Sequence, residues 1–193
     1  MLLYFLVGYC ALYCVIWLHE VGHGIVYAKY QCKDNPFKVH VPFYLFFSTP
    51  QPVNLDKVQF LTKKQDFYVG MGGIIINLIF GLPLATVFLT NEFNPSKGYF
   101  FIYAFTLFHL VEAATYLTIS NVFLASDIIS VQNYNPRLRI PLFIVGVGIV
   151  VLILFLIIKS PDLWKVGFTI SVTIMIICMG LGRMIFSRRA QMK

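Results

Sequence analysis

The sequence predicts an all-α polytopic membrane protein with about five transmembrane helices, built as one integral membrane domain over residues 1–193. Hydrophobic residues make up 59% of the chain and charged residues only 12%, and the mean hydropathy is +0.78. A soluble domain normally carries roughly a quarter charged residues. A soluble fold of this composition would lack the polar residues to cover its core. The composition therefore excludes an ordinary soluble enzyme, a disordered tail and a disulfide-stapled secreted module.

Five stretches are long and apolar enough to cross a bilayer, which needs about 20 mainly apolar residues. The fourth is short but wholly apolar, and the fifth carries a lysine near its start that can snorkel to the membrane surface. The predicted spans run from about Leu2 to Tyr27, Phe67 to Thr90, Gly98 to Ile119, Leu142 to Ile158 and Leu163 to Leu181.

The basic residues lie between these spans. Placing the amino terminus outside puts twelve of the 15 Lys and Arg in the inner segments, about 28–66, 120–141 and 182–193. Since basic loops are retained on the cytoplasmic side, we expect an outside N-terminus and a cytoplasmic C-terminus. Compactness and the lack of organelle signals favour a prokaryotic plasma membrane. No basic face interleaved with aromatic residues is present, so the expected partners are the lipid bilayer and membrane proteins, and nucleic acid is not one of them.

The segment between the first two spans, residues 31–66, predicts a small membrane-associated β-hairpin. Prolines interrupt the segment and break helix, while residues 37–41 and 43–47 are rich in the β-branched and aromatic types that favour strands. The alternative is a surface loop that places its aromatic residues in the membrane interface.

The first span ends in an HExxH sequence, His19-Glu20-Val21-Gly22-His23. Residues four apart lie on one face of a helix, so both imidazoles can reach one metal ion. Glu20 projects beside that metal, where it can take a proton from a water whose pKa zinc lowers from about 15.7 to about 7. The alternative is that these polar groups only mark the membrane interface, where they cost little.

A catalytic zinc requires a third protein ligand besides a water. The candidates in apolar surroundings are His109, Glu112 and Asp127. Asp127 follows an outside-to-inside span, so it is expected near the same membrane face as the HExxH sequence. His109 and Glu112 lie three residues apart on one helix face, where they can bond each other or support the metal ligands from behind.

Three motifs together resemble the site-2 protease family of intramembrane zinc metalloproteases. They are HEVGH in the first span, MGGIIINLIFG in the second and NVFLASD after the third, within roughly residues 10–130. The resemblance implies that His19 and His23 are zinc ligands, that Asp127 is the third ligand and that Glu20 is the catalytic base. It also implies hydrolysis of peptide bonds in or near transmembrane segments of membrane-protein substrates. Under this resemblance the predicted hairpin would hold an unwound substrate by strand addition, with Val39 and Val41 as substrate-binding residues.

The same family carries a Gly-x-x-x-Asn-like motif, which residues Gly73 to Asn77 match. The resemblance implies that Asn77 contacts the substrate or the oxyanion, as a catalytic and substrate-binding residue. Gly73, Asn77 and Gly81 also recur every four residues, a pattern typical of close helix contact. Asn77 can therefore serve in packing, in function or in both.

The chain departs from the family pattern after the third span. Ile128 follows Asp127 where the family usually has Gly, and no Pro precedes Asp127 in the run from Asn121. Both departures weaken the expected break in the helix. The chain shows no PDZ or nucleotide-sensing domain, so a regulator is expected to be a separate membrane protein. We expect a catalytic core over about residues 1–135 and accessory helices over about 140–186.

The alternatives to a protease are a membrane scaffold or chaperone, a metal transporter and a membrane di-iron oxidase. A membrane scaffold or chaperone of the same fold would bind transmembrane helices, but it would have no need of the base Glu20. A metal transporter would place ligands on several spans near mid-depth, whereas the ligand candidates gather toward one face. A membrane di-iron oxidase needs more histidines than the four present.

Overall fold

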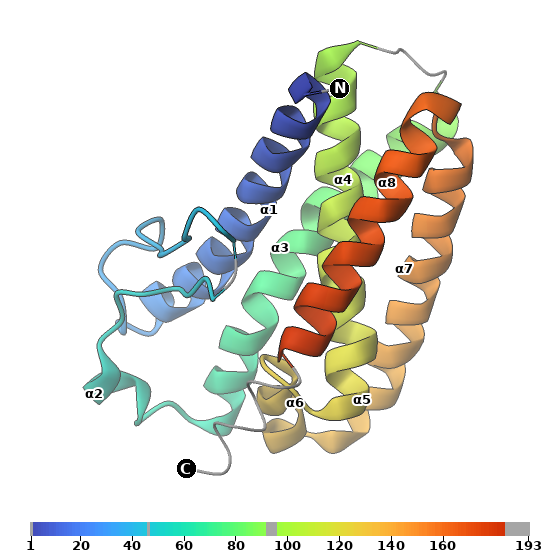
Figure 1. Cartoon of the computed structure of the whole chain (residues 1–193). Helices are drawn as coiled ribbons and strands as arrows, with labels where there is room; N and C mark the ends of the chain where they lie inside the picture. The colour runs from blue at the N-terminus through green and yellow to red at the C-terminus, as the bar shows by residue number, and fades with distance from the viewer. Residues whose placement is uncertain (1, 46, 92–95, 184–193) are drawn as a thin grey trace.

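The computed structural model describes residues 2–45, 47–91 and 96–183. Within this part of the chain, five helices are long and apolar enough to span a membrane, which confirms the predicted all-α, multi-pass architecture (Figure 1). The membrane helices are α1 (Leu2–Lys29), α3 (Lys63–Thr90), α4 (Lys97–Thr115), α7 (Arg139–Lys159) and α8 (Asp162–Met175). Shorter elements are α2 (Leu55–Val58), α5 (Asn121–Phe123), α6 (Ile128–Tyr134), a 3₁₀ turn (Pro136–Leu138) and π-helical turns at Tyr116–Ser120 and Ile176–Leu181.

Helix α4 is the centre of the bundle. In its most apolar window 83% of the residues are buried, against 22–39% in the other membrane helices. Helices α1, α3, α7 and α8 all contact α4, and Figure 1 shows it between α1 and α7. The polar residues of α4 are therefore shielded from lipid by the surrounding helices.

Helices α1 and α3 touch through glycine. A Cβ atom added to Gly22 would lie 2.5 Å from the carbonyl oxygen of Gly72, and one added to Gly72 would lie 2.6 Å from that of Gly22. Small residues let helix backbones approach closely in a membrane. A capping box between Thr62 and Gln65 fixes the start of α3. The close approach sets the HExxH residues of α1 directly against α3.

Helices α7 and α8 cover α4 on the side away from the connecting segment. Trp164 and Phe168 of α8 pack on the ring of Phe100 in α4, with ring centroids 4.9 and 5.3 Å apart. Large apolar side chains such as Ile144 and Phe155 stay exposed on α7, as expected of a surface that faces lipid. The division into a core and accessory helices stays a prediction.

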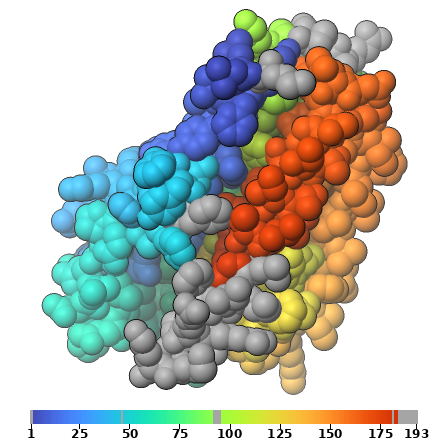
Figure 2. Space-filling view, viewed as in Figure 1, coloured from blue at the N-terminus to red at the C-terminus, as the bar shows by residue number. Residues whose placement is uncertain are grey.

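The predicted β-hairpin is not supported. Of the described residues between α1 and α2, only His40 and Thr49 pair, as a single antiparallel bridge. Prolines remove the donors that a ladder needs, and the left-handed backbone of Leu45 and Phe47 (φ 65° and 61°) turns the chain away from strand geometry. Figure 2 shows this segment as a mass on the side of α1 away from α7.

Instead of a ladder, one lysine organises the connecting segment. Lys33 is 6% exposed, and its ammonium group donates to the carbonyl oxygens of Lys38, Pro50 and Pro52 at 2.6, 2.6 and 2.9 Å. Three carbonyls match the three donors of an ammonium group. The segment is therefore folded around a buried cation rather than around strand pairing.

Candidate metal centre

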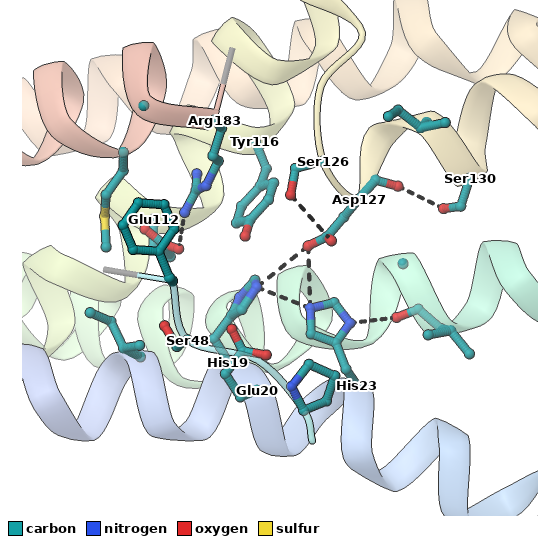
Figure 3. Close-up of a pocket in the computed structure, with 18 of the residues that line it drawn as sticks. His19, Glu20, His23, Ser48, Glu112, Tyr116, Ser126, Asp127, Ser130 and Arg183 are labelled. Carbon is teal, nitrogen blue, oxygen red and sulfur yellow. Dashed lines mark hydrogen bonds and ion pairs between the residues drawn. The ribbon is translucent and has the colours of Figure 1, made fainter. Parts of the chain in front are cut away.

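The HExxH residues lie in the second half of α1, where they face a cavity of about 820 Å³ among α1, α3, α4 and the end of the chain's last described helix (Figure 3). His19, Glu20 and His23 all line this cavity and are 2%, 7% and 5% exposed. The helix spacing predicted that the two imidazoles share one face of α1. Both rings lie on that face and direct Nε2 toward Asp127. The polar cluster is thus buried inside the bundle and is not spread along an interface.

Asp127 reaches the two histidines because the helix is interrupted between α5 and α6. Leu124 and Ser126 both adopt left-handed backbone conformations, with φ of 51° and 55°, which end the helix without a Gly or Pro. The hydroxyl of Ser130 then donates to the Asp127 carbonyl oxygen at 2.6 Å. The segment also lies on Gly70 of α3, where an added Cβ would lie 2.1 Å from the Ser130 oxygen. The helix break that the family pattern predicts therefore exists, supplied by other residues.

Three ligand atoms form a compact triangle. The Nε2 atoms of His19 and His23 lie 3.1 Å apart, and Asp127 Oδ2 lies 3.5 Å from the first and 3.2 Å from the second. In a tetrahedral zinc site with bonds of about 2.0–2.1 Å, ligand atoms lie about 3.3–3.4 Å apart. Apart from these two imidazole nitrogens, the buried Asp127 Oδ2 has no polar partner among the described residues. The three residues therefore fit a metal ion, and a donor set of two imidazoles and a carboxylate is one that several divalent metals accept.

Electrostatics favour the ligand form of Asp127. Burial by itself raises the pKa of this carboxyl, but the rings of His23 and His19 beside it lower the pKa below its usual value. Asp127 is therefore held as a carboxylate, which is the form that binds a cation.

Each histidine has a partner for its outer nitrogen, Nδ1. His23 Nδ1 lies 2.7 Å from the carbonyl oxygen of Val69, and His19 Nδ1 lies 3.0 Å from the side-chain amide of Asn77. Partners of this kind orient the ring and set which nitrogen carries the proton. Both rings are thus held with Nε2 toward Asp127.

The Gly-x-x-x-Asn motif supports His19. A Cβ atom on Gly73 would lie 2.5–2.7 Å from three atoms of the His19 ring, so only glycine leaves room for the imidazole. Asn77 is fully buried and is not among the residues that line the cavity. The structure therefore places Asn77 behind the ligand rather than at a position that contacts a substrate in the cavity. Gly81 of the same stripe packs against Leu110.

His109 and Glu112 do not bond each other. His109 Nδ1 lies 2.9 Å from Asn77 Oδ1, whereas Glu112 forms a buried ion pair with Arg183. Of the two alternatives that the sequence left open for His109, support of the ligands from behind is the one that its contacts favour.

Arg183 and Tyr116 complete the cavity, and sequence reasoning did not single them out. The Arg183 guanidinium lies 3.7 Å above the Tyr116 ring and donates to the Thr115 hydroxyl at 2.9 Å. The other face of the phenol stacks on His19, with ring centroids 4.9 Å apart and 9° between planes. Arg183 belongs to the basic C-terminal segment, where the membrane-topology pattern already explains its charge, so the sequence held no signal of this role.

The connecting segment lines the cavity through residues other than those predicted. Leu45, Phe47, Ser48 and Pro50 lie along the cavity, whereas Val39 and Val41 do not. Leu45, Phe47 and Ser48 belong to the loop that the His40–Thr49 bridge closes, and Pro50 follows the bridge directly.

Comparisons with known proteins do not assign the chain to a family. No protein-family model, curated protein or solved structure matches it. Its chemistry is therefore inferred from the site and from the sequence motifs.

Proposed function

We propose that this protein is an intramembrane zinc metalloprotease, similar in its chemistry to site-2 proteases. The observation that carries the proposal is the triangle of His19, His23 and Asp127, with ligand-atom separations of 3.1–3.5 Å, next to Glu20 in one cavity. A site that only stores or conducts a metal needs no carboxylate beside the three ligands. Glu20 supplies the general base that peptide hydrolysis requires.

The residues take distinct roles under this proposal. When bound, zinc supplies a Lewis acid that polarises a peptide carbonyl and activates water. Glu20 accepts the proton of the attacking water and passes it to the nitrogen of the leaving amine.

The position of the cavity supports a membrane-protein substrate. The metal ligands lie among the membrane helices α1, α3 and α4, and Leu45, Phe47 and Pro50 give the cavity an apolar side. Helical carbonyls are already hydrogen-bonded, so a transmembrane substrate must unwind locally before attack. We therefore propose that the cavity accepts an unwound stretch of a transmembrane segment, with any regulation supplied by a separate membrane protein.

The proposed orientation has the N-terminus outside and the C-terminus in the cytoplasm of a prokaryotic cell. The distribution of Lys and Arg supports it, because twelve of 15 then lie on the inner side. This orientation sets the metal centre toward the cytoplasmic half of the membrane. A reporter fused to the C-terminus reads out the topology.

The test separates zinc binding from catalysis. The full chain is purified in detergent, its zinc content is measured, and cleavage of a panel of labelled single-span membrane peptides is compared between wild type and Glu20→Gln. We expect one zinc in both proteins and a loss of cleavage of roughly 10²–10⁴-fold in the variant. Asp56→Asn is the matched control, because Asp56 is an exposed carboxylate outside the cavity lining.

Two outcomes would contradict the proposal. Unchanged cleavage in Glu20→Gln would show that Glu20 is not the base, and zinc binding without cleavage of any peptide by the wild type would favour a scaffold. In a further arm, Asp127→Ala should lower zinc occupancy. An unchanged occupancy would mean that the third ligand is a different residue.

A further inference from the structure

Asp127 lies on an interruption of the helix whose backbone is strained. Leu124 and Ser126 adopt left-handed backbone conformations, with φ of 51° and 55°, although neither is Gly, Asn or Asp, the residue types that adopt this conformation most readily. A backbone of this kind persists only where its surroundings hold it. Figure 3 shows the Asp127 carboxylate directed from this loop at His19 and His23. The contacts that hold the interruption therefore also decide where the third ligand atom lies.

One side chain from outside the interruption binds both of its flanks. Arg139 is the first residue of α7, and its guanidinium donates to the side-chain oxygen of Asn121 at 3.1 Å and to the Asn121 backbone carbonyl. The same guanidinium donates to the side-chain oxygen of Gln132 in α6 at 3.4 Å. Asn121 precedes the interruption and Gln132 follows it. A single guanidinium group therefore bridges the loop that carries Asp127.

The pairing of Asn121 with Arg139 is reciprocal. The Asn121 amide nitrogen donates to the Arg139 backbone carbonyl at 2.8 Å, while the amide oxygen accepts from the Arg139 guanidinium. A guanidinium group only donates and a carbonyl only accepts, so the two partners fix the direction of the amide. Asn121 is 2% exposed, so bulk water has little access to these bonds. The pair therefore ties the start of α5 firmly to the start of α7.

Arg139 is itself fixed because α7 packs closely on the segment that precedes Asn121. A Cβ atom added to Gly146 of α7 would lie 2.8 Å from a side-chain atom of Leu117 and 2.9 Å from one of Thr118. Both residues belong to the π-helical turn Tyr116–Ser120, and small residues allow such close helix contact in membranes. The helix that carries Arg139 is therefore a rigid support, although the sequence predicted α7 to be an accessory helix.

We propose that Arg139 is a positioning residue of the metal centre, which holds the strained loop so that Asp127 is directed at the two histidines. Arg139 does not line the cavity, so it acts through Asp127 and contacts neither the metal nor a substrate. The planar fork of the guanidinium is required, because the compact ammonium group of a lysine does not reproduce its geometry. The inference rests on the proposed function and adds that α7 takes part in building the metal site.

The test separates the positioning of Asp127 from a general loss of stability. The zinc affinity of the full chain in detergent is measured for wild type and Arg139→Lys, and the same comparison is repeated with Asp127→Ala present in both proteins. Amide hydrogen exchange of the metal-free proteins reports local opening at residues 121–132. Arg137→Lys is the matched control, because Arg137 is an exposed arginine on the neighbouring 3₁₀ turn.

We expect Arg139→Lys to lose about 10–100-fold in zinc affinity, the usual effect of removing a residue that orients a metal ligand. With Asp127→Ala present, the same change should have no further effect, because the ligand that Arg139 positions is already gone. Residues 121–132 should exchange faster in Arg139→Lys than in wild type, while exchange in α1 stays unchanged. Arg137→Lys should match wild type in every measurement.

The failures are distinguishable. If wild type binds no zinc, the proposed function is wrong, and hydrogen exchange alone decides whether Arg139 holds the loop: unchanged exchange at residues 121–132 in Arg139→Lys overturns that role. If wild type binds zinc and Arg139→Lys binds it equally well, or loses as much affinity with Asp127→Ala present, the positioning role is wrong.

A variant with a smaller change decides the question if Arg139→Lys does not fold. Gln132→Ala removes only one partner of the guanidinium. We expect a several-fold loss of zinc affinity that disappears with Asp127→Ala present, together with faster exchange at residues 121–132. A Gln132→Ala protein identical to wild type in both measurements overturns the inference.

Discussion

The wall of the cavity that α1 and α3 form is held by backbone contacts, whereas the wall that α4 and Arg183 form is held by side chains. On the first wall, Gly22 meets Gly72 and Gly73 leaves just enough room for His19. On the second, the Glu112–Arg183 ion pair and the Tyr116 ring fix the shape. A backbone contact has no spare volume, while a side-chain contact can be replaced by another of similar shape. The two walls should therefore differ sharply in which amino-acid substitutions they tolerate.

The largest effect on zinc affinity is expected on the first wall, from Gly73→Ala. The new methyl group would lie 2.5–2.7 Å from His19 ring atoms, so the ring must move or the helices must separate. We expect zinc affinity to fall by about 100-fold or more and the free energy of unfolding to drop by about 1–3 kcal/mol. Chelator competition and thermal unfolding in detergent measure the two effects.

The matched control for this change is Gly148→Ala on α7, where an added Cβ meets no atom within 4 Å. It should leave zinc affinity unchanged and raise stability slightly, because alanine favours helix over glycine by about 0.5–1 kcal/mol. If Gly73→Ala binds zinc as wild type does, the first wall is more deformable than its contacts indicate.

An intermediate effect on zinc affinity is expected on the second wall, from its ion pair, which should matter mainly for stability. Arg183→Met leaves the Glu112 carboxylate, whose side chain is 3% exposed, without its cation. Removing one partner of a buried pair costs about 3–5 kcal/mol of stability, whereas replacing both by apolar groups is often neutral. We therefore expect Glu112→Leu combined with Arg183→Met to be more stable than Arg183→Met alone, measured by thermal unfolding.

Zinc affinity provides the contrast with the first wall. The double variant should bind zinc within several-fold of wild type, because neither residue belongs to the ligand triangle. A double variant as unstable as Arg183→Met would mean that the pair is needed as charges, and the second wall would then be as intolerant as the first.

How much of the structure can be predicted from the sequence depends on whether an interaction joins residues that are near or far apart in the chain. The five spans and the HExxH face depend on composition and helix periodicity, so they are readable from short windows. Asp127 was predictable because its carboxylate stands in an apolar run. The ion pair of Glu112 with Arg183 joins residues 71 positions apart. The sequence around either residue contains no pattern that predicts the other as its partner.

The helix break and the connecting segment show where pattern reasoning stops. The break before Asp127 uses left-handed Leu124 and Ser126, residue types that rarely adopt this conformation, so the sequence around Asp127 gave no sign of it. Strand-forming residues predicted a hairpin, but the prolines and the buried Lys33 ammonium, with its three carbonyl partners, organise the segment differently. Tertiary contacts there outweigh local strand preference.

The smallest effect is expected from Tyr116→Phe, which tests whether the second wall depends on shape alone. The ring is sandwiched between His19, at a centroid distance of 4.9 Å, and Arg183, at 3.7 Å. Phenylalanine keeps both contacts, so zinc affinity and stability should stay close to wild type. Tyr116→Ala removes the ring and should cost about 3–5 kcal/mol, as large aromatic truncations do. A Tyr116→Phe protein that binds zinc normally but loses cleavage would show that the phenol hydroxyl takes part in the reaction, and the second wall would then be catalytic as well as structural.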